Sequence, residues 1–194
     1  MTSIIKVDNI QNSSGTSSMS IASNGFVIPP AGGIVQTQYT QIDATSVISC
    51  GANTDTAISV LSVNITPVST NSIIKIEAMV NGEWADDSSI YNSVWFFYRD
   101  STKLSAPAAG NRNVGILMAS SRSYTAADAD STPETAVYSY FDTPSTTSQI
   151  TYKVGVNQAL GSAVNWYLNQ TVNSSDNNGF ERGVSHICVT EIAG

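Results

Sequence analysis

Charged side chains are scarce in this chain. Asp, Glu, Lys and Arg account for 12% of its 194 residues, about half of the roughly 25% that globular proteins average. Eight of these residues are basic and fifteen are acidic, so the net charge is −7. Binding of nucleic acid depends on clustered Lys and Arg side chains, and the sequence has no such cluster. We therefore expect no nucleic-acid partner and a surface built mainly from Ser, Thr, Asn and Gln.

Long apolar runs are also missing. No uninterrupted run approaches the ~18–20 residues that a membrane-spanning helix requires. The opening residues, MTSIIKVDNIQ, have neither the basic start nor the apolar core of a signal peptide. Apolar types nevertheless make up 41% of the chain, which is enough for a buried core and too much for a disordered chain. We expect a soluble protein with no membrane insertion and no export by a signal peptide.

Residues that carry catalysis or bind metals are few. There is one histidine, His186, and the two cysteines, Cys50 and Cys188, lie far apart and match no Cys/His metal spacing. The GxSxG, HExxH and Walker patterns do not occur. Alternation places His186 on one strand face with Val184 and Cys188, so we interpret it as a core or interface residue. We interpret the cysteines as two buried thiols rather than a disulfide, and we expect no enzymatic activity, no cofactor and no metal.

Alternation of apolar and polar residues identifies the fold class. In residues 73–80 and 150–156 every second residue is apolar, from Ile74 to Val80 and from Ile150 to Val156, which is typical of strands with one buried face. Helix-forming residues are sparse and show no helical period. Further strands are predicted at residues 34–41, 57–66, 90–99, 114–119, 136–141, 164–169 and 184–192. The sequence therefore predicts an all-β fold, an antiparallel jelly-roll β-sandwich preceded by a short N-terminal β-arm.

The first thirty residues differ from the rest. We assign residues 1–32 to the β-arm and linker and residues 33–194 to the head domain. The arm opens with a β-like apolar run, Ile4, Ile5, Val7 and Ile10. Asn24-Gly25 suits a two-residue type I′ hairpin. A segment of this size cannot bury a core of its own, so we expect it to be ordered only against a neighbouring subunit or another protein.

The predicted strand at residues 90–99 is apolar on both faces. Tyr91, Trp95 and Phe97 alternate with Ile90, Val94, Phe96 and Tyr98. A strand of an antiparallel sandwich normally has one face in contact with water. Either a long loop or another subunit covers the second face, and we favour a subunit because a cyclic homo-oligomer buries a repeated aromatic patch. Tyr91, Trp95 and Phe97 are therefore the predicted subunit interface.

A second candidate site lies near Trp84. The acidic residues Glu83, Asp86 and Asp87 flank this tryptophan at the end of a predicted strand. An exposed indole stacks on sugar rings, so Trp84, Asp86 and Asp87 are candidate glycan contacts, with packing at the rim of the core as the other interpretation of Trp84. Paired carboxylates also cleave glycosidic bonds, which would assign Glu83 with Asp86 or Asp87. Loop carboxylates more commonly keep a surface solvated.

Four segments together resemble bacteriophage virion structural proteins, in particular fibre-like proteins of phages that infect cyanobacteria. They are IKVDNIQNSSGTSSMSIASNGFVIPP, AGGIVQTQYTQ, DTPSTTSQITYKV and ERGVSHICVTEIAG. In that family a short N-terminal β-motif precedes a jelly-roll head similar to those of tumour necrosis factor and complement C1q, which assembles as a trimer. The resemblance implies no enzyme and identifies no receptor-binding residue. Many such fibres have a long shaft, whereas this chain passes from Pro30 to its first sandwich strand within a few residues.

The resemblance sets the functional expectation. It implies a non-enzymatic virion protein, made in the host bacterial cytoplasm, that forms a homotrimeric knob. The arm, through Ile4, Ile5, Val7 and Ile10, would anchor the knob to other virion proteins of the capsid or tail. The role would be host adhesion at a tail-fibre tip or decoration of the capsid. The alternative function is a carbohydrate-binding module that recognises host surface glycans.

Overall fold

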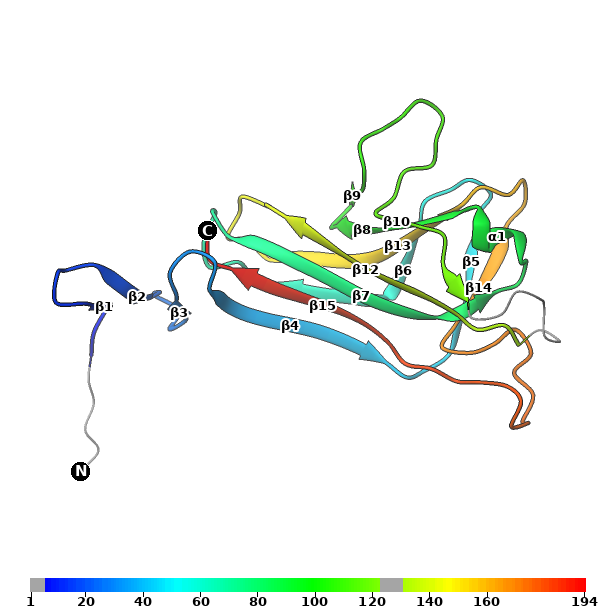
Figure 1. Ribbon diagram of the computed structural model, residues 1–194, viewed down its shortest axis with the longest axis horizontal. Coiled ribbons are helices and arrows are strands. Elements are labelled where there is room, and N and C mark those ends of the chain that lie inside the picture. Colours follow the sequence, from blue (N-terminus) through cyan, green and yellow to red (C-terminus); the bar gives the residue numbers. More distant parts are fainter. Residues whose placement is uncertain (1–5, 123–130) are drawn as a thin grey trace.

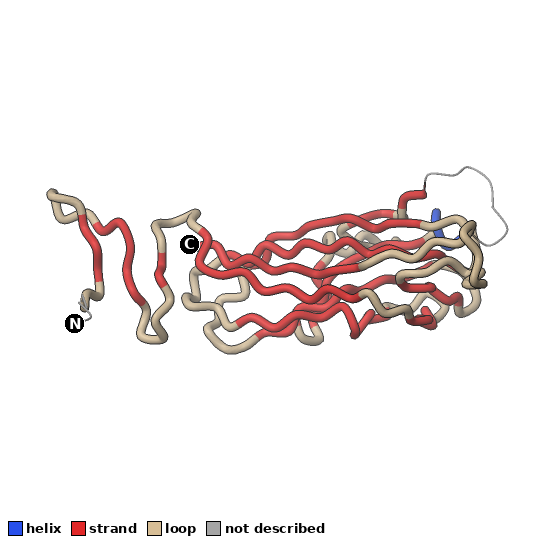
Figure 2. Tube along the Cα trace, turned by 90° about the horizontal axis from the view of Figure 1, so that it is seen from below, coloured by secondary structure: helices blue, strands red, loops and turns tan. Residues whose placement is uncertain are grey.

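The computed structural model describes residues 6–122 and 131–194. A three-stranded arm, β1 (Asn9–Gln11), β2 (Ser17–Ile21) and β3 (Val27–Ile28), extends from one end of a β-sandwich (Figures 1 and 2). The sandwich contains β4 (Ile34–Ile42), β5 (Ser46–Cys50), β6 (Thr56–Ile65), β7 (Ile73–Trp84), β8 (Ser93–Arg99), β9 (Thr102–Leu104), β10 (Leu117–Met118), β11 (Ser121–Arg122), β12 (Glu134–Asp142), β13 (Ile150–Gln158), β14 (Val164–Leu168) and β15 (Ser185–Ile192). One helical turn, α1 (Ser88–Tyr91), precedes β8.

The strand order is that of a jelly roll. The first sheet runs β11-β12-β7-β15-β4, and β14 and β5 continue it beside the far end of β7. The second sheet runs β6-β13-β8, and β9 and β10 both pair with β8. If β9 and β10 count as one interrupted strand, eight principal strands form two antiparallel sheets of four, β4-β15-β7-β12 and β6-β13-β8-β9/β10, which is the jelly-roll arrangement. The predicted all-β antiparallel sandwich is confirmed.

The core forms where the alternating apolar residues of the two sheets meet. Ile74 to Val80 on β7 and Ile150 to Val156 on β13 have the predicted inward side chains, all essentially inaccessible to solvent. β15 contributes Ile187 and Val189 in the same way. Each strand therefore buries one face, as period-two alternation requires.

Three tryptophans pack together between the sheets. Trp84 on β7, Trp95 on β8 and Trp166 on β14 have ring centroids 5.1–6.3 Å apart, and none is more than 1% exposed. Gly82 makes room for the cluster, because a Cβ atom at this position would lie 2.7 Å from the Trp166 ring. None of the three indole N–H groups has a hydrogen-bond partner among the described residues. The cluster is therefore stabilised by apolar packing.

Several predicted strand boundaries are wrong. The strand predicted at residues 90–99 begins at Ser93, because Ser88 to Tyr91 form α1. This turn begins where the Ser88 backbone N–H donates a hydrogen bond to the Asp86 side chain (2.8 Å). The strand predicted at residues 114–119 is reduced to β10, and the sequence did not predict β5, β9 or β11.

The predicted two-residue hairpin in the arm is also wrong. β2 and β3 are joined through Ala22 to Phe26, and the backbone N–H of Ala22 donates to the Phe26 carbonyl. Gly25 has a positive φ of 87° but Asn24 does not. A type I′ turn needs positive φ at both central residues, so the longer loop replaces it.

We predict that Trp95→Ala lowers the free energy of unfolding by ~3–5 kcal/mol, since it removes a fully buried aromatic side chain. Tyr91→Ala is the matched control, because this ring is 69% exposed and a surface change costs about 0.5 kcal/mol or less. Urea denaturation followed by tryptophan fluorescence measures both. Equal losses in the two variants would contradict the placement of Trp95 in the core.

Candidate functional site

The structure overturns most of the predicted subunit interface. Trp95 and Phe97 are 0% exposed and belong to the core within a single chain, so they are not available to a second subunit. Phe97 stacks on Tyr138 across the sandwich, with 4.5 Å between ring centroids. Tyr91 is exposed, but it lies on α1 rather than on the strand. Alternation identified two apolar faces correctly but could not show which of them points into the core.

The other face of β8 is covered by the chain itself. Phe96 is 0% exposed although it points away from the core. Lys103 lies over its ring, with Nζ 4.1 Å from the centroid, and Tyr98 contacts its edge. Beneath the ring lies Gly155, where a Cβ atom would collide with Phe96. The second apolar face of this strand therefore needs no partner subunit.

The predicted glycan site is not formed around Trp84. This indole is 1% exposed and cannot stack on a sugar. Asp86 and Asp87 are exposed, but Asp87 pairs with Arg122 at 3.2 Å. Glu83 is buried, and its carboxylate accepts hydrogen bonds from Thr132 and from the Val172 backbone N–H. The interpretation of Glu83 as a catalytic group is therefore wrong, since its oxygens hold two loops.

The arm exposes its apolar side chains. Val7 and Ile10 are 41% and 44% exposed, whereas Ile4 and Ile5 lie outside the described residues. The remaining arm residues of this kind, each at least 36% exposed, are Met19, Ile21, Phe26 and Val27. The linker is tied to the sandwich by two backbone hydrogen bonds, from Gly32 to Ala193 and from Ala193 to Gly33. The arm is thus fixed at its base and carries apolar side chains that face solvent.

The outer face of the first sheet is a second surface with exposed apolar side chains, which lie among Ser, Thr, Asn and Gln residues, and we call it the contact face. We define it by the outward residues Tyr39 (β4), His186 and Cys188 (β15), Met79 (β7), and Val137 and Phe141 (β12). Cross-strand pairing places His186, Met79 and Val137 in one row, where they line a hollow of about 580 Å³ with Cys188. Tyr39, Val137 and Phe141 are 72%, 63% and 58% exposed.

The contact face carries no net charge. Among the solvent-facing outward positions of β4, β7, β12 and β15, the only charged residues are Lys75 and Glu77, which form an ion pair at 2.8 Å; Glu83, at the far end of β7, is covered by loops. Burial, and then the charge of Glu77, raise the pKa of the Cys188 thiol, so this thiol is neutral at pH 7. The prediction that His186 and Cys188 share a strand face is confirmed, but both are half-exposed. Cys50 is buried as expected, and both cysteines are free thiols.

Both edges of this sheet lack a partner strand among the described residues. β4 pairs only with β15, so its other edge is open along Ile34–Ile42. β12 pairs with β11 only at Glu134 and Thr135, so its edge is open beyond that point. Open edges are sites for further strand or subunit contacts unless they are blocked by charge or covered.

A buried carboxylate at the far end of the sandwich was not predicted from the sequence. Glu134 is 1% exposed, and its oxygens accept hydrogen bonds from the Trp84 backbone N–H (3.2 Å) and from the Ser120 hydroxyl. Desolvation raises the pKa of Glu134 to about 7, and the nearby Glu83 carboxylate adds to this shift. The sequence did contain a sign that Glu134 is buried. Alternation places Glu134 on the same strand face as Ala136 and Tyr138, which point into the core.

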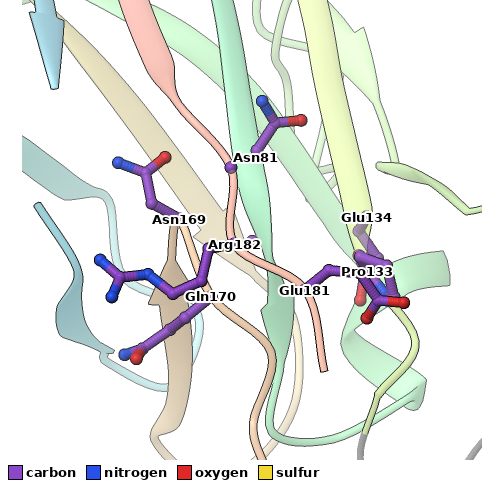
Figure 3. Close-up of a pocket in the computed structure, with 9 residues that line it drawn as sticks. Asn81, Pro133, Glu134, Asn169, Gln170, Glu181 and Arg182 are labelled. Carbon is purple, nitrogen blue, oxygen red and sulfur yellow. The ribbon is translucent and has the colours of Figure 1, made fainter. Parts of the chain in front are cut away.

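Glu134 borders a small cavity of about 230 Å³ (Figure 3). Its lining also includes Glu181 and Arg182, from the segment before β15, and Asn169, which follows β14. The Glu181 carboxylate accepts a hydrogen bond from the Ser131 hydroxyl at 2.8 Å, so the acidic groups here connect loops to one another. Within residues 6–122 and 131–194, no three His, Cys, Asp or Glu side chains gather in a way that could hold a metal ion.

Comparison with protein-family models and with curated proteins finds no match to this chain. In the described part of the chain, no helix is long and apolar enough to cross a membrane.

We predict that the stability of the protein falls as pH rises from about 4.5 to 7. In this window folded Glu134 retains a proton that the unfolded chain has released, because its pKa is raised to about 7. Unfolding therefore releases a proton, and the contribution reaches at most about 3 kcal/mol. Glu134→Gln removes this part of the slope. Urea denaturation at a series of pH values measures it, and identical slopes in both proteins would contradict the assignment.

Proposed function

We propose that this chain is a non-enzymatic structural protein of a bacteriophage particle, which forms a homotrimeric knob attached through residues 1–32. The knob would act in host adhesion at a tail-fibre tip or in decoration of the capsid. The observation that carries the proposal is the contact face, which has exposed apolar side chains, no net charge and an open strand edge on either side. The jelly-roll order and the short N-terminal β-motif also match the family that the sequence resembles.

The size of the contact face supports contact with another copy. Four strands of about nine residues, at ~3.3 Å rise and ~4.8 Å spacing, span roughly 600 Å² in projection. This is comparable to the ~800 Å² that each partner buries in a stable interface. The internal pairing of Lys75 with Glu77 leaves no uncompensated charge to desolvate. A second copy of the chain would therefore bury this face without leaving a charge unpaired.

The distribution of exposed residues supports a ring. Val137 and Phe141 lie at the β12 edge, whereas Tyr39 and Ile34 lie at the β4 edge. The β12 edge of one copy would pack onto the β4 edge of the next copy, which is a head-to-tail contact. Such contacts form a closed ring when the rotation that relates neighbouring copies is a whole fraction of a full turn. We propose a ring of three copies, because the family that the sequence resembles forms trimers.

The arm supports attachment to a larger particle. The three arm strands are two to five residues long and largely exposed, so they bury little apolar surface by themselves, and the arm extends from one end of the sandwich (Figure 2). In a ring, the arms of all copies would leave from the same end. Their exposed apolar residues would then be buried by other virion proteins.

We expect the full chain to have a trimeric mass by light scattering at micromolar concentration. Val137→Lys places a charge in the contact face and should give a monomeric mass, because burial of an unpaired charge is unfavourable. Val60→Lys is the matched control, since Val60 is 43% exposed on β6 of the other sheet. A monomeric wild-type chain would overturn the trimer, and a trimeric Val137→Lys variant would overturn the contact face.

Removal of residues 1–28 should abolish binding to virus particles and leave the trimeric mass unchanged. The reason is that the arm shares no core with the sandwich. Antibody labelling of intact particles in electron micrographs tests the location, and label on neither capsid nor tail would overturn the virion assignment. Equal particle binding by the truncated and full chains would overturn the role of the arm.

A further inference from the structure

A polar pocket of about 440 Å³ lies on the outer side of the second sheet, away from the contact face. Its lining comes from four separate segments: residues 53–55 after β5, Lys103 on β9, residues 112–114 before β10, and Asn157 on β13. The loop that carries Arg112 projects from the sandwich in Figure 1, and its residues 106–112 are exposed. A polymer chain could therefore reach the pocket without entering the protein.

Hydrogen bonds hold the polar groups of this pocket in place. Asp55 Oδ1 accepts from Lys103 Nζ and from Asn157 Nδ2, each at 2.8 Å. Asn113 Nδ2 donates to Asn157 Oδ1 at 3.0 Å, and Asn157 is only 5% exposed. Fixed donors and acceptors lose little freedom when a ligand arrives, which favours binding.

The charge around the pocket is unusual for this protein. The chain is acidic and has eight basic residues in all. Three of them lie on this side of the second sheet: Lys103 on β9, Arg112 in the loop before β10, and Lys153 on β13. Asp55 is the one carboxylate among the residues that line the pocket, and Lys103 already pairs with it. The Arg112 guanidinium has no ion pair among the described residues. Arg112 is therefore free to bind an anion.

An aromatic ring borders the same surface. Tyr98 is the cross-strand neighbour of both Lys103 and Lys153, and Lys153 Nζ lies 5.7 Å from its ring centroid. Burial, and then the charge of Asp55, raise the pKa of the Tyr98 phenol. The hydroxyl therefore keeps its proton at neutral pH and can donate a hydrogen bond.

We propose that this pocket binds an anionic sugar residue of a polysaccharide, with Arg112 pairing with the sugar carboxylate, Asn113 and Asp55 contacting its hydroxyls, and Asn157 holding these two side chains in place. Arginine binds carboxylates through two parallel hydrogen bonds. Amide and carboxylate side chains match the alternating donors and acceptors of sugar hydroxyls. A mainly apolar ligand would gain little in a pocket with this lining. The inference goes beyond the proposed function and does not depend on assembly, because one chain contains the whole pocket.

Binding of the full chain to three uronate polymers, polygalacturonate, alginate and hyaluronate, tests the proposal by isothermal titration calorimetry. We expect binding to at least one of them and at least tenfold weaker binding to neutral dextran. Arg112→Gln should weaken uronate binding at least tenfold. Arg182→Gln is the matched control, because it removes the same charge from an exposed arginine in the segment before β15, and it should bind like the wild type.

Three results would overturn this site. One is the absence of binding to all three uronates, and another is unchanged binding by Arg112→Gln. The third is an equal loss in Arg112→Gln and Arg182→Gln together with equal or stronger binding to dextran sulfate, which would show attraction by charge alone. A urea denaturation midpoint for Arg112→Gln equal to that of the wild type would show that a loss of binding does not come from failed folding.

Discussion

The packing of three tryptophans between the sheets is the constraint on which the rest of the structure depends. Trp84, Trp95 and Trp166 come from β7, β8 and β14 and hold the two sheets together at one end of the sandwich. Because β8 directs Trp95 and Phe97 inward, its largest aromatic residues stabilise the single chain. The surfaces left for partners are consequently those that the core does not use, which include the outer face of the first sheet, the arm and the polar pocket on the outer side of the second sheet.

The few charged residues of this chain have different roles in the interior and on the surface. Buried carboxylates such as Glu83, Glu134 and Glu191 accept hydrogen bonds from loop backbones and hydroxyls, and so fasten loops to strands. On the contact face the single ion pair between Lys75 and Glu77 leaves an uncharged surface. Contacts made by such a surface depend little on ionic strength, unlike exposed ion pairs. The proposed assembly would therefore tolerate variable natural waters.

Strands in which apolar and polar residues alternate regularly could be predicted from the sequence. Short strands that form only by pairing with another strand could not. β7 and β13 show alternation over many residues, so local pattern and final structure agree. β5, β9 and β11 are two to five residues long and form by pairing with strands distant in the sequence or next to them in the sheet, namely β14, β8 and β12. Residues 88–91 form a helical turn because the Asp86 side chain bonds the Ser88 backbone, which no periodicity records.

Composition and alternation were enough to predict the all-β class and the low charge of the chain. The side of the aromatic strand that is buried could not be predicted in this way, because a strand with two apolar faces has no local preference between them and long-range pairing makes the choice. The same holds for the candidate sites. Tyr39, Met79, Val137 and His186 are distant in sequence and become one face only when β4, β7, β12 and β15 pair. The polar pocket around Asp55 likewise needs the pairing of β8 with β9 and β13, since long-range strand contacts bring its residues together.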